Sequence, residues 1–114
     1  MANICENRFY FICEKNFDYY VEEFKNLIGL EPDQLEGDLL GEYCNNSDDN
    51  DPDGGWLEGW FNSKWSFPMH KFENMFNAED GVYFRCLSEE YGCGYVAMNI
   101  FDGDDWRPEQ TFYI

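Results

Sequence analysis

The feature that most constrains the fold is an amphipathic stretch near the N-terminus. Apolar residues recur there every three or four positions, and acidic residues fall mostly between them. This spacing predicts a helix over 17–28, because a period of 3.6 residues places the apolar side chains on one face. Asn16 is suited to cap its first turn, and Gly29 is suited to end it. The apolar positions are Phe17, Tyr20, Val21, Phe24, Leu27 and Ile28.

Strand composition is found on both sides of this helix. Residues 6–14 are rich in aromatic and apolar side chains, which is typical of a strand buried on much of both faces. The same composition predicts strands at 56–61, 82–87 and 95–101, and 106–113 is a candidate for one strand more.

Two prolines favour further helices. Pro32 favours a short helix through Leu35, after which residues 39–43 would return to the core, and Pro68 favours a helix with Met69, Phe72, Met75 and Phe76 on one face. The order β-α-β-α-β-β predicts an α+β fold, in which two helices cover one face of an antiparallel or mixed sheet of four or five strands. The length predicts a single domain over 1–114.

The charge of the chain limits its partners. There are 24 Asp and Glu residues against 7 Lys and Arg residues, a net charge of -17. This sign disfavours nucleic acid, anionic lipid and acidic substrates, and it favours a cation or a basic protein surface. B-DNA carries one charge on the order of every 100 Å² of surface. A globular chain of this size has about 400 Å² per net charge, so a protein that imitates DNA has to gather its acids on one face.

The acidic residues fall into three groups. Residues 45–55 contain no side chain that favours burial and are predicted to form a loop. These acids could bind a basic protein surface, and the alternative is that they only keep an aromatic-rich protein soluble. The three groups are Asp48, Asp49, Asp51 and Asp53 in the loop, then Glu31, Asp33, Glu36, Asp38 and Glu42 before it, and Asp102, Asp104 and Asp105 near the C-terminus.

Part of the acidic loop resembles a calcium site. The pattern Asp49-x-Asp51-x-Asp53-Gly54 is the first half of an EF-hand loop, with its glycine in the right place. The twelfth position, which should be a bidentate Glu, is Trp60, and the nearest acid is Glu58. A weak divalent-cation site within 49–58, on a non-catalytic binding module, is therefore kept as an alternative to a solvated loop. No cofactor is expected.

The chain offers little for catalysis or secretion. His70 is the only histidine, and no local motif pairs it with a Ser or Cys nucleophile, so we do not expect an enzyme. The N-terminus is unlike a signal peptide, and no stretch is apolar for long enough to span a membrane. Five cysteines without a C-x-x-C pair indicate reduced thiols in the cytoplasm.

Three blocks resemble the YubB-type ferredoxin-like family of plasmid and phage proteins. These are the opening Met-Ala-Asn with Cys5-Glu6-Asn7-Arg8, the run Phe61–Pro68 with Phe67 in place of the family's first proline, and Ser88-Glu89-Glu90-Tyr91-Gly92. The resemblance implies a ferredoxin-like fold and an origin on a mobile element, but no known activity. The acidic loop does not belong to it.

These observations lead to one functional hypothesis. A small acidic protein with a scaffold of mobile-element type is expected to inhibit a host defence complex by occupying its basic nucleic-acid-binding surface in place of DNA. A CRISPR effector is the first candidate partner, in the manner of acidic anti-CRISPR proteins, and a restriction enzyme is the alternative. Trp56 and Trp60, next to the acidic loop, are candidate apolar anchors for that partner, although packing in the core is the simpler interpretation.

Overall fold

The computed structural model describes residues 4–29, 36–43, 54–92 and 94–113.

The side chains of strand β1 (Ile4–Cys13) alternate strictly between the two faces of the sheet. Every odd-numbered side chain of β1 is buried, whereas the even-numbered ones are exposed or half-buried. The expectation of a strand buried on both faces was therefore wrong. Charged residues at Glu6 and Arg8 require one face to meet solvent.

Helix α1 (Phe17–Gly29) confirms the predicted amphipathic helix. Phe17, Tyr20, Val21 and Phe24 are buried against the sheet. The cap differs from the expectation, because Asn16 has a positive φ of 63° and its side-chain amide donates to the Asp80 carboxylate at 2.8 Å. A Cβ on Gly55 would lie 2.6 Å from Cγ of Phe17, so the helix begins where the facing strand has no side chain.

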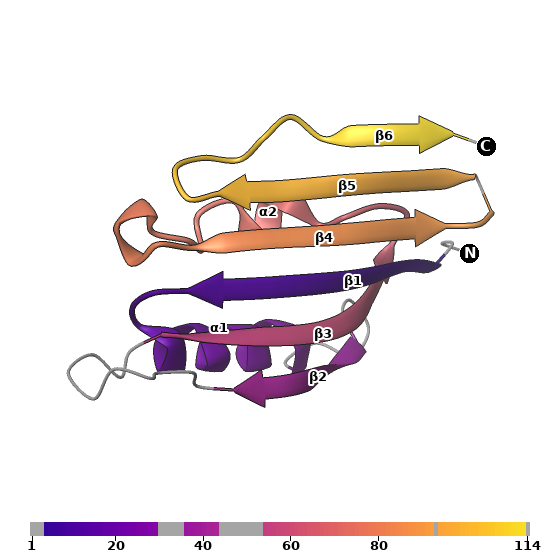
Figure 1. Ribbon diagram of the computed structural model, residues 1–114. Helices are drawn as coiled ribbons and strands as arrows, with labels where there is room; N and C mark the ends of the chain where they lie inside the picture. The colour runs from indigo at the N-terminus through magenta and orange to yellow at the C-terminus, as the bar shows by residue number, and fades with distance from the viewer. Residues whose placement is uncertain (1–3, 30–35, 44–53, 93, 114) are drawn as a thin grey trace.

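All the described strands form one antiparallel sheet in the order β2-β3-β1-β4-β5-β6, shown face-on in Figure 1. Two of them, β2 and β6, are edge strands. The six strands exceed the predicted four or five, and two helices accompany them, which confirms the α+β class. The remaining strands are β2 (Glu36–Tyr43), β3 (Gly55–Lys64), β4 (Tyr83–Glu90), β5 (Tyr95–Asp102) and β6 (Gln110–Tyr113).

Strand β2 was not anticipated from the sequence. Residues 36–43 pair with β3, with a register shift between Leu40 and Tyr43. Three acids and two glycines within eight residues give this strand poor intrinsic strand propensity, and it forms because β3 supplies the pairing. The predicted helix over 32–35 lies outside the described residues.

The second helix is shorter than predicted. Helix α2 covers only Met69–Phe72, and a 3₁₀ turn, η1 (Ala78–Asp80), follows it. The side chains expected on its inner face nevertheless pack on the core, with Phe72 buried and Met69, Met75 and Phe76 partly buried. The backbone after α2 is held by other hydrogen bonds than those of a helix. The side-chain oxygen of Asn77 accepts the amide hydrogen of Glu79, and the backbone carbonyl of Asp80 accepts the amide hydrogens of Glu14 and Lys15 at 2.9 and 3.1 Å.

Aromatic rings fill the space between the sheet and the helices. Phe9 stacks on Phe24 with ring centroids 5.0 Å apart, and Phe84 contacts Phe72 at 5.5 Å. Complete burial of each such side chain stabilises the fold by about 1.5–3 kcal/mol. Because α1 contributes Phe24 and the α2 segment contributes Phe72 to one cluster, both helices lie on the same face of the sheet.

A buried polar group joins three strands on this covered face. The side-chain amide of Asn7 donates to Ser63 Oγ at 2.9 Å and to the carbonyl of Phe61 at 3.1 Å. Ser88 Oγ donates to Asn7 Oδ1 at 2.6 Å. The group is therefore satisfied internally and fixes β1 between β3 and β4.

Among the described residues, no helix is long and apolar enough to cross a membrane.

Candidate functional site

The face of the sheet opposite the helices is uncovered in the described part of the chain, and it carries a concave site. A hollow of about 740 Å³ lies over the central strands β1, β3 and β4. This volume is within the range of small-molecule binding sites. Side chains that alternate with the buried ones line it, notably Arg8, Tyr10, Trp60, Arg85, Leu87 and Met98.

Strand register determines which of these side chains are neighbours. Arg8 pairs with Trp60 across β1 and β3, and Tyr10 pairs with Arg85 across β1 and β4. Opposed side chains of antiparallel strands have Cβ atoms about 5 Å apart. Accordingly, Cζ of Arg85 lies 5.2 Å from the centroid of the Tyr10 ring, in cation–π contact. Tyr10 also stacks on Trp56, with centroids 6.5 Å apart and planes inclined by 15°.

Two cations and two acids line the hollow. Arg8 and Arg85 are both exposed, and so are the carboxylates of Glu6 and Glu58. Within the described ranges, the one ion pair that forms joins Arg107 to Asp102, so neither arginine of the hollow is paired with a described acid. The site can therefore donate hydrogen bonds from guanidinium groups and accept them at carboxylates, beside aromatic rings.

The two tryptophans proposed as anchors lie on this uncovered face. Trp60 is 39% exposed, and Trp56 is half-buried against Tyr10. Packing in the core, the simpler interpretation of the sequence, is therefore wrong for both. Their alternation with buried Leu57 and Phe61 is the reason, because a strand with one apolar face directs the intervening side chains outward.

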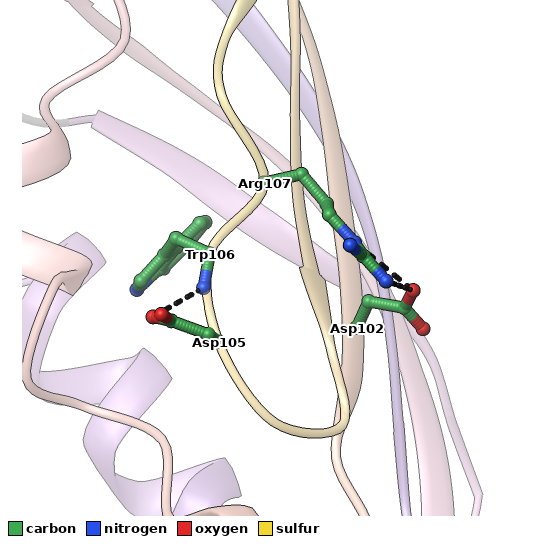
Figure 2. A network of polar contacts seen from close by, with 4 residues as sticks. All are labelled: Asp102, Asp105, Trp106 and Arg107. Carbon is green, nitrogen blue, oxygen red and sulfur yellow. Dashed lines mark hydrogen bonds and ion pairs between the residues drawn. The ribbon is translucent and has the colours of Figure 1, made fainter.

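Asp102, Asp104 and Asp105 lie in and beside the turn that follows β5, and Figure 2 shows the contacts of Asp102 and Asp105. Asp102 Oδ2 accepts from Arg107 Nη2 at 2.7 Å and from its Nε at 3.2 Å. Asp105 Oδ1 accepts from the backbone N–H of Trp106 at 2.8 Å, and the Asp105 carbonyl accepts the amide of Asp102 at 3.2 Å. Two of the three acids thus stabilise the turn, and Asp104 remains exposed.

The other acidic groups are only partly described. Glu36, Asp38 and Glu42 belong to edge strand β2, whose backbone register places Asp38 opposite Trp60. Glu31, Asp33 and the four loop aspartates, Asp48, Asp49, Asp51 and Asp53, lie outside the described residues. The proposed cation loop over 49–58 is therefore described only from Gly54 onward. In the described ranges, no group of three or more His, Cys, Asp or Glu side chains is placed to hold a metal ion.

Titratable groups on the covered side of the sheet have shifted pKa values. Burial raises the pKa of the Cys5 thiol to about 11. Burial also acts to raise the pKa of Glu109, but hydrogen bonds from Asn99, Thr111 and Tyr95 outweigh it and lower that pKa below its usual range. Neither group lies in the hollow, and burial for Cys5 and hydrogen bonds for Glu109 account for the two shifts.

The hollow itself was missed at the level of sequence. Arg8, Tyr10 and Arg85 come from two strands that are more than 70 residues apart in the chain, and only the register brings them together. The available signal was the spacing of Glu6, Arg8 and Tyr10 at every second position, with Cys5, Phe9 and Phe11 among the residues between and beside them, which indicates an exposed face. It does not indicate which strand lies beside it.

Comparison with models of protein families gives no match, and no curated protein or solved structure gives a significant one. Proposals about function therefore rest on the residues and their geometry.

Proposed function

We propose that this protein is a non-catalytic inhibitor that binds the basic nucleic-acid-binding surface of another protein in place of DNA. One observation carries the proposal, namely the uneven distribution of charge. Nine of the 24 acidic residues lie within 31–53, and that segment contains no Lys or Arg. The described part of the segment is β2, an edge strand of the described sheet, and it carries Glu36, Asp38 and Glu42 (Figure 1).

The amount of charge makes this unevenness necessary for mimicry. The surface of 7066 Å² divided among 17 net charges gives about 420 Å² per charge, against on the order of 100 Å² for B-DNA. An even distribution would be only about a quarter as dense as DNA. Concentration of the acids at the β2 edge is thus what such a partner would require, because its Lys and Arg groove responds to local charge.

The chain's architecture supports a ferredoxin-like assignment. Strands β1 to β4 lie in the order β2-β3-β1-β4, with α1 joining β1 to β2 and α2 joining β3 to β4. This is the connectivity of a split β-α-β pair, and β5 and β6 extend the sheet beyond β4. The assignment agrees with the resemblance to the YubB-type family and hence with a phage or plasmid origin.

The kind of partner follows from that origin. A mobile element benefits from blocking host proteins that hold foreign DNA, so a CRISPR effector complex is the first partner to test and a restriction enzyme the second. The cytoplasm is the compartment in which both act. The buried thiols of Cys5 and Cys86 form no disulfide, which supports a reducing location.

A displacement assay tests the proposal. Purified effector complex is loaded with fluorescent target DNA, and the protein is added at low salt, where electrostatic competition is strongest. We expect release of DNA, with an inhibition constant that weakens steeply as salt is raised. Failure to release DNA from any CRISPR effector or restriction enzyme at low salt would refute the proposal. Release that is insensitive to salt would show that charge is not its basis.

A further inference from the structure

The hollow on the uncovered sheet face differs in character from the acidic edge. The chain has only seven Lys and Arg residues, yet two of them, Arg8 and Arg85, line this one depression. They lie on adjacent strands and are offset by two residues, because Arg8 is opposite Leu87 and Tyr10 is opposite Arg85. Such diagonal neighbours are close enough for one anionic group to contact both guanidinium groups.

The surroundings of the two arginines restrict the ligand further. Trp60 is opposite Arg8 across the strands, and the Arg85 guanidinium lies over the ring of Tyr10, so each arginine has an aromatic residue as its neighbour. The exposed ring of Trp60 favours a planar aromatic group, which stacks on it. Glu6 and Glu58 flank the arginines in the same hollow and supply hydrogen-bond acceptors. The complementary ligand combines an anion, a flat ring and hydrogen-bond donors on the edge of that ring.

We propose that this hollow binds a guanine mononucleotide. Its phosphate would contact Arg8 and Arg85, and its base would stack on the exposed ring of Trp60. Guanine presents two adjacent N–H donors on one edge, which match the two oxygens of a carboxylate such as that of Glu58. A mononucleotide also fits the volume of about 740 Å³. A long nucleic acid is disfavoured, because its phosphates outside the hollow would meet a chain of net charge -17.

This inference does not depend on the proposed inhibition of a DNA-binding protein. Calorimetric titration of the purified protein with GMP, guanosine, AMP and inorganic phosphate tests it, with the indole N–H signals of the tryptophans followed by NMR. We expect saturable binding of GMP that is stronger than binding of AMP, with a shift of the Trp60 signal. Guanosine should bind more weakly than GMP, and phosphate alone more weakly still.

Single substitutions separate the parts of the site. Arg8→Gln and Arg85→Gln should each weaken GMP binding by roughly tenfold, as expected for loss of a charge-assisted hydrogen bond, and leave guanosine binding unchanged. Trp60→Leu should weaken the binding of both. Arg107→Gln is the matched control, because it removes the same charge from a guanidinium that Asp102 already holds. Thermal melts establish that each variant is folded.

Three results would overturn the inference. One is the absence of saturation by GMP at about 1 mM, the weak end of specific binding. Another is GMP binding that responds equally to Arg107→Gln and to Arg85→Gln. The third is a single-stranded guanine-containing oligonucleotide that binds far more tightly than GMP, which would assign the face to a polymer instead.

Discussion

Removal of one buried hydroxyl should destabilise the protein measurably. The Tyr20 hydroxyl donates to Asp80 Oδ2 at 2.6 Å and accepts the backbone N–H of Asn77 at 3.1 Å. Tyr20 is 1% exposed and Asp80 is 7% exposed, so water does not easily replace the bond between them. These contacts attach the segment after α2 to helix α1. Tyr20→Phe keeps the ring in the core and deletes both bonds.

The magnitude follows from the groups that lose their partners. A hydrogen bond to a charged group contributes about 1.5–3 kcal/mol. The bond from the backbone N–H of exposed Asn77 contributes about 0.5–1.5 kcal/mol more. Asp80 retains the bond from Asn16, which limits the loss. We therefore expect Tyr20→Phe to lower the free energy of unfolding by about 2–4 kcal/mol. For a chain of this length, the Tm should fall by roughly 4 °C for each kcal/mol.

The neighbouring tyrosine provides a matched control. Tyr19 is 56% exposed, and its hydroxyl forms no hydrogen bond within the described ranges. Tyr19→Phe makes the same chemical change on the same helix and should alter stability by no more than about 0.5 kcal/mol. Urea unfolding followed by circular dichroism measures both variants. If the Tyr20 variant loses no more than the Tyr19 variant, the buried contacts of Asp80 do not hold the two segments together.

Three other predictions concern charge and thiols. Hydrogen bonds lower the pKa of Glu109 in the folded state, so the stability that its carboxylate contributes is present at neutral pH and is lost as the pH falls through that pKa. Glu109→Gln should therefore lower the Tm slightly at pH 7, and the corresponding loss of stability should be less than about 1 kcal/mol because the group is exposed. The Tm curves of the two proteins against pH should converge in acid rather than stay parallel. Changing the four aspartates of 48–53 to Asn should leave the Tm unchanged or raise it, since close like charges cost about 1 kcal/mol per pair in water, and should weaken partner binding with a smaller salt dependence; a lower Tm in metal-free buffer would instead make the loop structural. After Cys44 and Cys93 are changed to Ser, the remaining thiols should react with a thiol reagent only in denaturant, because they are buried and Cys5 has a pKa of about 11; rapid reaction of the folded variant would contradict this.

The secondary structure was predictable where one element carries its own signal. Helix α1 follows from its apolar spacing alone, and β5 follows from a run that neighbouring turns delimit. Strand β2 was not predictable, because its acids and glycines oppose a strand and only pairing with β3 stabilises it. Helix α2 was overestimated, since Met75 and Phe76 reach the core from irregular backbone rather than from further helical turns.

The candidate sites divide in the same way. The amount of acidic charge and its concentration in 31–53 are properties of the sequence, and they need no structure. The hollow depends on the register between β1, β3 and β4, which is a long-range property that no local pattern encodes. Trp60 illustrates both cases: its exposure follows from alternation with buried neighbours, but its place beside Arg8 does not.

The most direct test of the proposed function compares two variants with equal charge. One replaces Glu36, Asp38 and Glu42 of the β2 edge by their amides, and the other does the same to Asp18, Glu22 and Glu23 of helix α1. Each is assayed for release of target DNA from a purified CRISPR effector at low salt. If acids at the β2 edge replace DNA phosphates, the edge variant should lose about tenfold or more in potency and the helix variant less than about threefold. Equal losses in the two variants would contradict a localised acidic site and leave only a general effect of net charge.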